Sequence, residues 1–326
     1  MTSPDGQRPV FRVLEPGPYA TVQDAGRVGW QQFGVPPSGA LDQYSFRLAN
    51  WLVGNAEDAA VLELTFLGPR LEVLSSADVA LTGADMPFLV NDRPMPAWRT
   101  VRVEAGDVIR LRQVRSGLRA YLAVGGGVAA PPVMGSRSTY PAAALGGLAG
   151  RPLRQGDLVP AYPAASLAHP RSTPEEFVPV PSREITLGAV PGPQDDHFSA
   201  GLDTFFGAAY KVSSKVDRMG YRLEGPAVAL APGAPQSIIS EPTLPGGVQI
   251  PPDGQPIVLL VEQTTSGYNK IATVVTADLP PLAQARPGDT VRFSRLSLEQ
   301  GWEKLAAFRS RLARAKAAIT GQTAAT

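Results

Sequence analysis

Hydrophobic residues in this chain of 326 residues occur mainly in short apolar and β-branched runs, and 33 glycines and 33 prolines interrupt these runs at close intervals. Such spacing is typical of many short strands in a barrel or a sandwich. The sequence therefore predicts a mainly β protein. The runs predicted as strands are Ala60–Phe66, Val79–Leu81, Val101–Val103, Val108–Leu111, Ala120–Val124, Ile185–Val190, Ala227–Leu230, Ile257–Val261, Ile271–Val275 and Thr290–Phe293.

Helical periodicity is clearest in two stretches. Residues 41–53 repeat apolar side chains every three or four positions, which predicts an amphipathic helix. Ser297 and Gln300 have the spacing of a capping box, and apolar residues then recur at helical spacing as far as Leu312. We therefore expect a C-terminal helix that packs back on the body of the protein.

Residues 160–182 contain six prolines and little periodicity, and we interpret this stretch as a semi-rigid connection between two domains. Similar Gly-Pro and Gly-Asp turns occur on both sides of it, which indicates two related β-barrels in tandem, although such turns are also a common way to enter any strand. The expected parts are an N-terminal barrel at 1–160, the linker at 161–183, a second barrel at 184–296, and a helix and tail at 297–326.

Composition excludes several kinds of chemistry. The chain has no cysteine and only two histidines, His169 and His197, so thiolate catalysis, iron–sulfur clusters and histidine-rich metal centres are not expected. Lysine plus arginine number 30 against 29 acidic residues, with no long basic run, and this balance makes nucleic acid an unlikely partner.

The sequence also lacks the features of membrane insertion and secretion. No run approaches the roughly 20 apolar residues that a membrane span requires. The first residues do not place a charged region before an apolar one, as a secretory signal does. We therefore expect a cytoplasmic protein that does not bind a membrane.

The first polar cluster joins the segment T-V-Q-D-A-G-R to the segment S-G-A-L-D. Gln23, Asp24 and Arg27 can present an amide, a carboxylate and a guanidinium group from one glycine-containing loop. Ser38 and Asp42 lie near the start of the predicted helix, where an anion is favoured. The alternative is an ordinary turn with an internal Asp–Arg pair and a helix cap.

A second cluster follows the glycine run at 125–128 and contains Ser136, Arg137 and Thr139. Glycines after a strand, followed by hydroxyl groups and an arginine, suit a phosphate or carboxylate site. The segment is not a Walker loop, because no G-K-[ST] follows, and it is not a dinucleotide fingerprint, because no helix follows. An ordinary turn remains the alternative.

Two further clusters lie in the C-terminal half. The first concentrates charge around an Asp-Arg pair, although a plain strand with solvated charges would look the same. The second could line one mouth of the second barrel, although glutamines and threonines in strands commonly face solvent. The candidate residues of the first of these clusters are Lys215, Asp217, Arg218 and Arg222. Those of the second are Glu241, Gln249, Gln263, Thr264 and Tyr268.

In this order, the segments resemble the carboxyltransferase-type family that includes KipA, the second subunit of allophanate hydrolase, the carboxyltransferase region of urea carboxylase and the C subunit of bacterial 5-oxoprolinase. The resemblance extends over about residues 10–295. The matching motifs are T-V-Q-D-x-G-R at 21–27, S-G-A-L-D at 38–42, A-N-x-L-V-G-N at 49–55, G-G-G-V at 125–128, G-S-R-S-T at 135–139, P-G-P-Q at 191–194, D-R-M-G-Y-R-L at 217–223, G-x-x-Q-x-P-x-D-G-x-P at 246–256 and A-Q-A-x-P-G-D at 283–289.

One position departs from the family pattern. The family usually has G-G-Y-P where this chain has Ser266, Gly267, Tyr268 and Asn269. Losing a glycine adds a side chain beside the candidate tyrosine, and losing the proline loosens the turn. We therefore expect the local pocket to differ from that of the family.

The resemblance implies two cyclophilin-like β-barrel domains and an obligate KipI-like partner, which corresponds to the B component of 5-oxoprolinase, together with a protein like its A component. Family reactions act on an N–C=O unit, whose resonance makes the carbon a poor electrophile. Such a site must offer donors to the carbonyl oxygen and an acceptor to the N–H. The catalytic candidates on the matching motifs are Arg27, Arg218 and Tyr268 as donors, and Asp24, Asp217 and Glu241 as acceptors.

The reaction that this resemblance favours is ATP-dependent hydrolysis of 5-oxo-L-proline to L-glutamate, with ATP bound mainly by the complex. The chain shows no fused biotin-carboxylase or carrier region, which commonly accompanies urea carboxylase. One alternative is the carboxyltransferase subunit of a urea carboxylase or allophanate hydrolase system, with carboxybiotin delivered by a carrier protein. Another is a non-catalytic regulator that binds the KipI-like protein.

Overall fold

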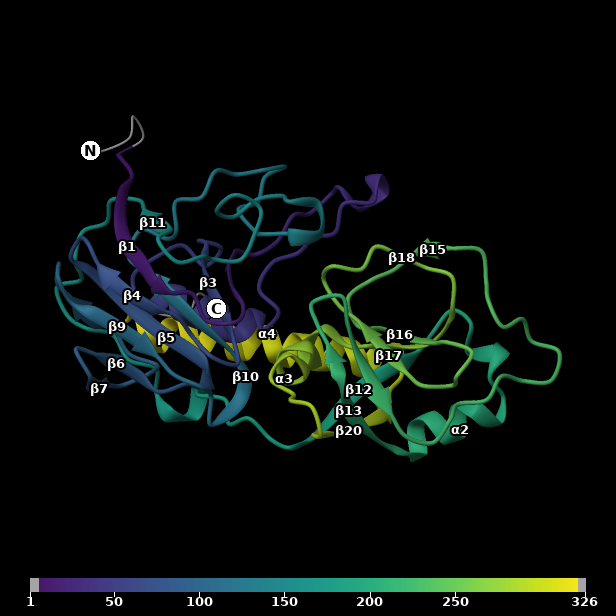
Figure 1. Cartoon of the computed structure of the whole chain (residues 1–326). Coiled ribbons are helices and arrows are strands. Elements are labelled where there is room, and N and C mark those ends of the chain that lie inside the picture. The colour runs from purple at the N-terminus through teal and green to yellow at the C-terminus, as the bar shows by residue number, and fades with distance from the viewer. Residues whose placement is uncertain (1–5, 322–326) are drawn as a thin grey trace. The chain divides into compact units, whose positions relative to one another are not determined.

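The computed structural model describes residues 6–321, which form two compact units (Figure 1). Of the described residues, the first unit comprises 6–27, 38–181 and 311–321, and the second comprises 28–37 and 182–310. Residues 322–326 of the predicted tail lie outside the described part.

The first unit is built from two antiparallel sheets that enclose one hydrophobic core. In the six-stranded sheet the order is β11 (Leu158–Ala161), β1 (Arg8–Glu15), β4 (Arg70–Val73), β9 (Val108–Leu111), β6 (Phe88–Val90) and β7 (Arg93–Met95). In the five-stranded sheet it is β2 (Ala20–Gln23), β3 (Val61–Thr65), β10 (Ser116–Val124), β5 (Ala77–Asp85) and β8 (Val101–Val103).

Side-chain alternation explains how the six-stranded sheet packs. On β4 and β9, Leu71 and Ile109 are fully buried, while the next residues along each strand point outward. The helix α1 (Gln43–Leu52) contacts β5 and β10 of the five-stranded sheet. Because α1 buries eight of its ten residues, it belongs to the interior of the first unit and not to its surface.

The proline-rich segment is a correction to the expected linker at 161–183. The carboxylate of Asp78 accepts a hydrogen bond of 2.7 Å from the N–H of Leu167. Arg171 donates from Nη1 to the carbonyl oxygen of Trp51 at 2.6 Å. Residues up to 181 therefore belong to the first unit, because Asp78 and the Trp51 carbonyl group accept hydrogen bonds from the segment.

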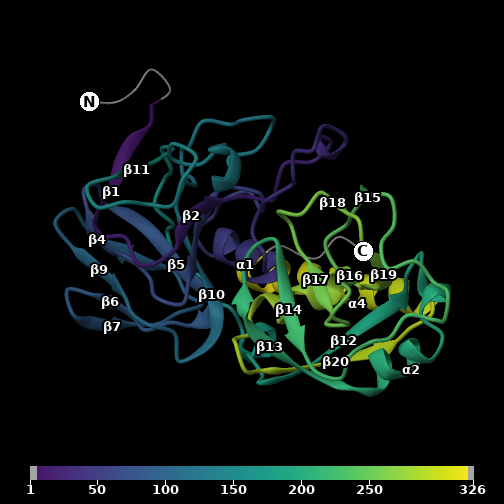
Figure 2. The ribbon, with the colours of Figure 1, turned by 45° about the vertical axis from the view of Figure 1, so that its right-hand side comes forward.

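The second unit is a closed barrel (Figure 2). Its strand order is β12 (Glu184–Pro191), β19 (Asn269–Val274), β16 (Gly247–Ile250), β17 (Ile257–Leu259), β14 (Gly220–Glu224), β13 (Ala209–Val216) and β20 (Thr290–Arg295). The parallel pairing of β20 with β12 closes it. A separate two-stranded sheet joins β15 (Glu241–Pro242) to β18 (Thr265–Ser266). The predicted mainly β class is thus confirmed, with a closed barrel in this unit and two sheets in the first.

Alternation again separates the barrel interior from its outer face. Tyr221 and Leu223 of β14 are fully buried, whereas Arg222 between them is exposed. Phe205 of α2 (Ala200–Gly207) stacks on Phe293 with ring centroids 4.3 Å apart and covers one side of the interior. The remaining short helices are η1 (Gln31–Phe33), η2 (Pro141–Ala143), η3 (Glu175–Phe177), η4 (Asp195–His197), η5 (Thr276–Asp278) and α3 (Leu279–Ala283).

The C-terminal helix α4 (Leu298–Thr320) starts as predicted. Ser297 donates its N–H to Gln300 Oε1 at 2.8 Å, and Gln300 returns its own N–H to Ser297 Oγ at 3.2 Å. This reciprocal pair is the capping box that the spacing predicted. Leu312, Ala315 and Ile319 are buried, which places one face of the last turns against the first unit.

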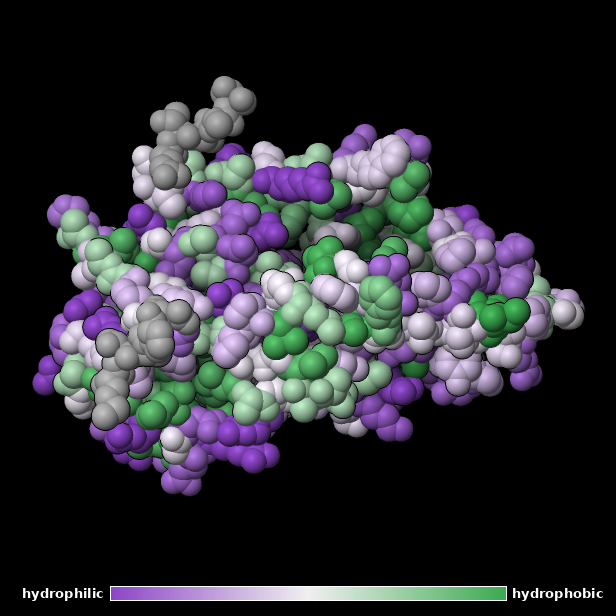
Figure 3. Space-filling model, turned by 90° about the horizontal axis from the view of Figure 1, so that it is seen from above, coloured by the Kyte–Doolittle hydropathy of each residue, from purple (hydrophilic) through white to green (hydrophobic). Residues whose placement is uncertain are grey.

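One predicted strand is wrong. Residues 227–230 form no strand, because Val228 donates a single backbone hydrogen bond, to Gly254, and no ladder continues from it. In the described residues, no helix is both long and apolar enough to cross a bilayer. Figure 3 shows hydrophobic residues scattered among hydrophilic ones on the face seen from above.

Candidate functional site

The polar motifs of the first unit do come together, and they bind mainly one another. The loop after β2 lies against the segment 136–139, which is more than 110 residues away in the chain. Asp24 is the centre of this contact. Its carboxylate accepts from Ser136 Oγ at 2.7 Å, from the Gly26 N–H at 2.9 Å, and also from Ser138 Oγ and the Arg137 N–H. Four donors on one buried carboxylate make Asp24 the organiser of this cluster.

Arg27 is fully buried beside Asp24. Its Nε donates to the carbonyl oxygen of Val133 at 3.0 Å, and its Nη2 donates to that of Ser138 at 2.9 Å. Burial lowers the pKa of Arg27, and the attraction of the Asp24 carboxylate partly offsets this effect. The guanidinium group therefore serves first to fix the loop that carries residues 133–138.

Gln23 and Thr139 complete the same network. Gln23 donates from Nε2 to Thr21 Oγ1 at 3.0 Å and to the Thr139 carbonyl at 3.2 Å, and its Oε1 accepts from the Gly39 N–H at 3.1 Å. Ser38 has a left-handed backbone with φ of 52°. Within residues 6–321, Ser38 Oγ is buried without a hydrogen-bond partner.

Asp42 caps α1, as its place in the sequence suggested. Its Oδ1 accepts from the Ser45 N–H at 2.9 Å, and its own N–H donates to the Tyr121 hydroxyl at 2.8 Å. The Tyr121 hydroxyl donates in turn to Glu63 Oε2 at 3.0 Å. Burial raises the pKa of Tyr121 well above its ordinary value, and repulsion from Glu63 and Asp42 adds to the effect.

The glycine run of the first unit is not a phosphate cradle. The N–H groups of Gly125, Gly126 and Gly127 already donate to Asp78 O, Asn55 Oδ1 and Val124 O. A methyl group at Gly126 would lie 2.1 Å from the Tyr162 carbonyl oxygen, so the glycine is required by a close approach of the chain to itself. Arg137 binds the same tyrosine, donating from Nη2 to its hydroxyl at 2.9 Å.

The second unit contains a pocket of about 240 Å³ whose lining includes five predicted residues. Its centre lies on the outer face of the barrel, because Arg222 stands between the buried Tyr221 and Leu223 of β14, and Ile257 and Gln249 share the face of Arg222 through direct strand pairing. The five are Lys215, Asp217, Arg222, Gln249 and Gln263. Ile257 and Leu259, which the motifs did not identify, form an apolar wall.

The pairing of three strands determines which side chains lie at the centre of this pocket. Ile257 pairs directly with Arg222 on one side and with Gln249 on the other. Side chains of directly paired residues lie on the same face of a sheet. The pocket therefore presents a guanidinium group and an amide on either side of an apolar residue, with Lys215 contributing a second cation.

Ser266, one of the departures from the family pattern, binds a pocket residue. Its Oγ accepts the Tyr268 N–H at 3.1 Å and forms a hydrogen bond with Gln249 Oε1. An amide oxygen can only accept, so the serine hydroxyl is the donor. This contact occupies the oxygen of Gln249 and leaves its NH₂ group for the pocket.

Asp217 and Arg218 face different environments. Asp217 Oδ1 accepts from the N–H groups of Met219 and Gly220 at 2.8 and 3.0 Å, which closes a tight turn at the pocket edge. Arg218 is buried and its Nε pairs with Glu262 Oε1 at 2.6 Å. Sequence reasoning missed Glu262, because a glutamate after an apolar strand carries no distinguishing signal.

Glu241 also has partners that the motifs did not reveal. Lys270 Nζ forms an ion pair with Glu241 Oε1, and Gln194 Nε2 donates to the same oxygen at 3.0 Å. The hydrogen bond from Lys270 lowers the pKa of Glu241, and the one from Gln194 contributes. Lys270 is one of five lysines in the chain, and this scarcity was the available clue.

Asn269, the second departure, replaces the missing proline with hydrogen bonds. Its Nδ2 donates to the Pro235 carbonyl at 2.7 Å, and its Oδ1 lies 2.8 Å from His197 Nδ1. Because the amide oxygen can only accept, His197 Nδ1 is the donor of this hydrogen bond. Tyr268 itself is half-exposed, and neither it nor Thr264 lines the pocket.

The charged side chains of the described part do not gather as a metal site. Among residues 6–321, no group of three or more histidine, aspartate or glutamate side chains is placed to hold an ion.

Comparison with known proteins places the chain in a family. The family profile "Carboxyltransferase domain, subdomain A and B" matches residues 33–295. The chain is 38% identical to the C subunit of 5-oxoprolinase from Escherichia coli (strain K12) over 298 residues, which cover 89% of this chain and 93% of the relative. It is 34% identical to urea amidolyase of Lachancea kluyveri over 310 residues, which cover 89% of this chain and 17% of the relative.

Solved structures agree with these relatives. The crystal structure of the K. lactis urea amidolyase superposes with a TM-score of 0.88 at 31% identity and covers 94% of this chain. The chain spans about a fifth of that larger protein, with 20% coverage. The 5-oxoprolinase C subunit and the urea amidolyases each match about 89% of this chain. The family resemblance that the motifs indicated is therefore confirmed. The chain belongs to the carboxyltransferase-domain family that contains subdomains A and B.

Proposed function

We propose that this chain is a subunit of an ATP-dependent 5-oxoprolinase and that the pocket of the second unit binds the cyclic amide. The complex would convert 5-oxo-L-proline, ATP and water to L-glutamate, ADP and phosphate. Relatives named as the C subunit of 5-oxoprolinase match along nearly their whole length, which supports this choice. The observation that carries it is the row of Arg222, Ile257 and Gln249 on one face of the barrel.

The pocket fits the two ends of this substrate. 5-Oxoproline has a carboxylate on one side of a small apolar ring and a lactam on the other. In the proposal, Arg222 and Lys215 bind the carboxylate, because charged donors form the strongest hydrogen bonds to it. Ile257 contacts the ring, and the Gln249 NH₂ group donates to the lactam oxygen. Asp217 lines the same pocket, and its carboxylate accepts the lactam N–H.

Ring opening requires that the amide carbon become a better electrophile. Donors that face the oxygen as negative charge grows there lower the barrier. With ATP, phosphorylation of that oxygen would activate the amide carbon and release ADP. Water then adds to this carbon, the ring C–N bond breaks as the nitrogen takes up a proton, and a second water releases phosphate from the resulting acyl phosphate to leave glutamate. In this scheme Gln249 steadies the oxygen, and Ser266 is a positioning residue that holds Gln249 in the donor orientation.

The phosphate groups of ATP are assigned to the partners. The glycine run at 125–128 has its N–H groups bonded internally, so it does not supply a cradle for them. The proposal therefore includes a KipI-like protein as the B component and a further protein like the A component of 5-oxoprolinase, assembled in the cytoplasm. In this arrangement the chain contributes the amide site and the partners contribute the nucleotide site.

Reconstitution with both partners tests this function. The purified subunits are mixed with isotopically labelled 5-oxoproline and ATP, and glutamate and ADP are measured. We expect equimolar glutamate and ADP from the complete complex and neither product from single subunits. A complete complex that leaves 5-oxoproline intact would contradict the proposal.

A second candidate is supported by the fold of the urea amidolyase relative. In this alternative the chain transfers a carboxyl group from carboxybiotin, delivered by a carrier protein, to urea. Urea has an N–C=O unit but no carboxylate, so the cations of the pocket would have no partner on it. Consumption of urea in the presence of a carboxylated carrier, with 5-oxoproline untouched, would select this function.

A further inference from the structure

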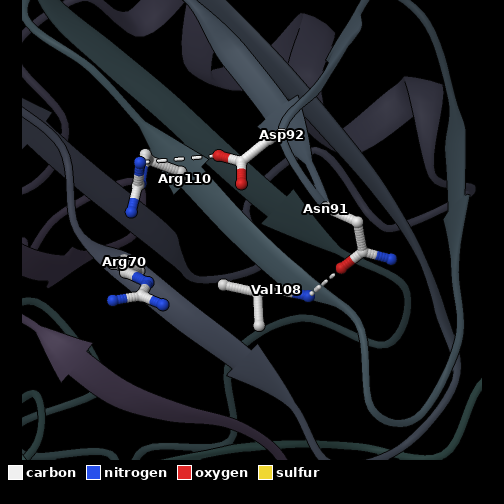
Figure 4. Close-up of a pocket in the computed structure, with 5 residues that line it drawn as sticks. All are labelled: Arg70, Asn91, Asp92, Val108 and Arg110. Atoms are coloured by element: carbon white, nitrogen blue, oxygen red, sulfur yellow. Dashed lines mark hydrogen bonds and ion pairs between the residues drawn. The ribbon is translucent and has the colours of Figure 1, made fainter.

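We propose that the outer face of the six-stranded sheet of the first unit holds a binding site for a small oxyanion, a phosphate or carboxylate group, between Arg70 and Arg110. A pocket of about 280 Å³ lies here, lined by these arginines with Asn91, Asp92 and Val108 (Figure 4). This site is independent of the proposed amide pocket, because every residue that lines it belongs to the first unit.

The strand register forces two positive charges together. Arg70 of β4 pairs directly with Arg110 of β9, and both side chains point away from the core because Leu71 and Ile109 point into it. Like charges directly opposite each other destabilise a sheet. An anion between the two guanidinium groups would reverse the sign of that interaction.

A neighbouring pair on the same face, Arg12 and Glu72, shows an arginine whose charge is balanced by the residue directly opposite. Arg12 of β1 stands directly opposite Glu72 of β4, with Nη1 and Oε2 2.8 Å apart. Arg70 and Arg110 instead each form a longer ion pair, through Nη1, with a carboxylate that does not stand directly opposite. The distances are 3.3 Å from Arg70 Nη1 to Glu15 and 3.4 Å from Arg110 Nη1 to Asp92.

Donors exceed acceptors inside this pocket. Figure 4 shows both guanidinium groups beside the same space, with Asp92 at its rim. Each guanidinium has five N–H bonds. The oxygen of Asn91 is already occupied, since it accepts from the Val108 N–H at 2.9 Å.

The chemistry of these groups defines the ligand. Guanidinium groups bind phosphate and carboxylate oxygens through paired N–H donors, and two of them on adjacent strands can hold one oxyanion from two sides. A second pocket shares Arg70 and Arg110, and its lining adds one further cation, Arg112, and one carboxylate, Glu15. A ligand with an anionic group and a polar body would fit this geometry.

Anion titration of the isolated full chain tests the site. Inorganic phosphate, ADP and malonate are titrated separately at low ionic strength, and binding is followed by NMR shifts of the arginine side chains. We expect saturable shifts at Arg70 and Arg110 with phosphate. Comparing ADP with malonate then identifies which source of oxyanion binds better.

Variants supply the controls. Arg70→Gln and Arg110→Gln should each weaken phosphate binding about tenfold to a hundredfold, which is the loss expected for one charged hydrogen-bonding group. Arg12→Gln removes a positive charge from the same face outside the pocket and should change the affinity less than twofold. Asp92→Asn keeps a residue that tolerates its left-handed φ of 60° and should strengthen binding.

The outcome that overturns the proposal is equally defined. If phosphate, ADP and malonate produce no saturable shift at Arg70 and Arg110, the site does not exist. If Arg12→Gln weakens binding as much as Arg70→Gln does, the effect reflects net charge and not a built site. Asp92→Asn removes a negative charge that should repel an anion in this pocket. An unchanged phosphate affinity in this variant would show that the anion does not bind beside Arg110.

Discussion

The polar cluster of the first unit and the pocket of the second unit draw on the same residue types but use them differently. Asp24 accepts four hydrogen bonds from its own chain and is almost fully buried. Arg222 lies in an open pocket and is exposed. The comparison teaches that one family motif can serve to hold the fold together, whereas another can leave its polar side chains exposed in a pocket.

Replacing the central carboxylate of the cluster should cause the largest effect. Asp24→Ala leaves buried hydroxyls and an amide unpaired and removes the charge that faces Arg27, so we expect a loss of roughly 3–5 kcal/mol in the free energy of unfolding. Urea denaturation measures this loss. Asp217→Ala, which removes an exposed turn cap, is the matched control and should cost about 1 kcal/mol. Equal losses would contradict the structural role of Asp24.

Replacing the exposed arginine of the pocket should affect activity and spare the fold. Arg222→Gln removes the charged donor for the substrate carboxylate, so we expect kcat/KM for 5-oxoproline to fall about tenfold to a hundredfold. The unfolding free energy should stay within about 0.5 kcal/mol of the original protein. Arg292→Gln alters an exposed arginine of β20 outside the pocket and should leave kcat/KM unchanged. A comparable fall in Arg292→Gln would show that general charge matters and not the pocket.

Ser266 offers a finer test of how the pocket is oriented. Ser266→Gly restores the family glycine and frees the Gln249 amide to rotate, so we expect kcat/KM to fall roughly threefold to tenfold. Ser266→Ala should behave like the glycine variant, and Ser266→Thr should recover activity, because only threonine keeps the hydroxyl. If the alanine variant is as active as the original chain, the hydrogen bond to Gln249 has no part in binding.

The smallest expected effect concerns the ion pair beside β15. Lys270 lowers the pKa of Glu241 in the folded state, so the pair stabilises the protein above the unfolded-state pKa of the glutamate, and this contribution disappears as pH falls through the lower folded-state value. Glu241→Gln should therefore cost at most about 1 kcal/mol near neutral pH. The difference between the two proteins should vanish in acid. A difference that persists in acid would exclude the ion pair as its cause.

Much of the fold could be predicted because local patterns determine it. Short apolar runs punctuated by glycine and proline indicated the β class, and the spacing of Ser297 and Gln300 located the start of α4. The attachment of residues 161–181 to the first unit could not be foreseen, since it depends on Asp78 and Trp51, which are far away in the chain.

The site was predictable as a set of residues and not as a geometry. The motifs contained Arg222 and Gln249, but only strand register shows that both flank Ile257. Buried partners such as Glu262 were missed because nothing in their local sequence distinguishes them. Pairing between distant segments is what turns a list of polar residues into a pocket.

The most direct test of the central claim compares two substrates in two proteins. In the reconstituted complex, kcat/KM is measured for 5-oxoproline and for 2-pyrrolidinone, which has the same lactam ring without the carboxylate. If the second-unit pocket binds the substrate as proposed, Arg222→Gln will reduce kcat/KM for 5-oxoproline at least about tenfold and leave the value for 2-pyrrolidinone unchanged. Equal losses for both substrates, or no loss for either, would contradict the assignment of this pocket.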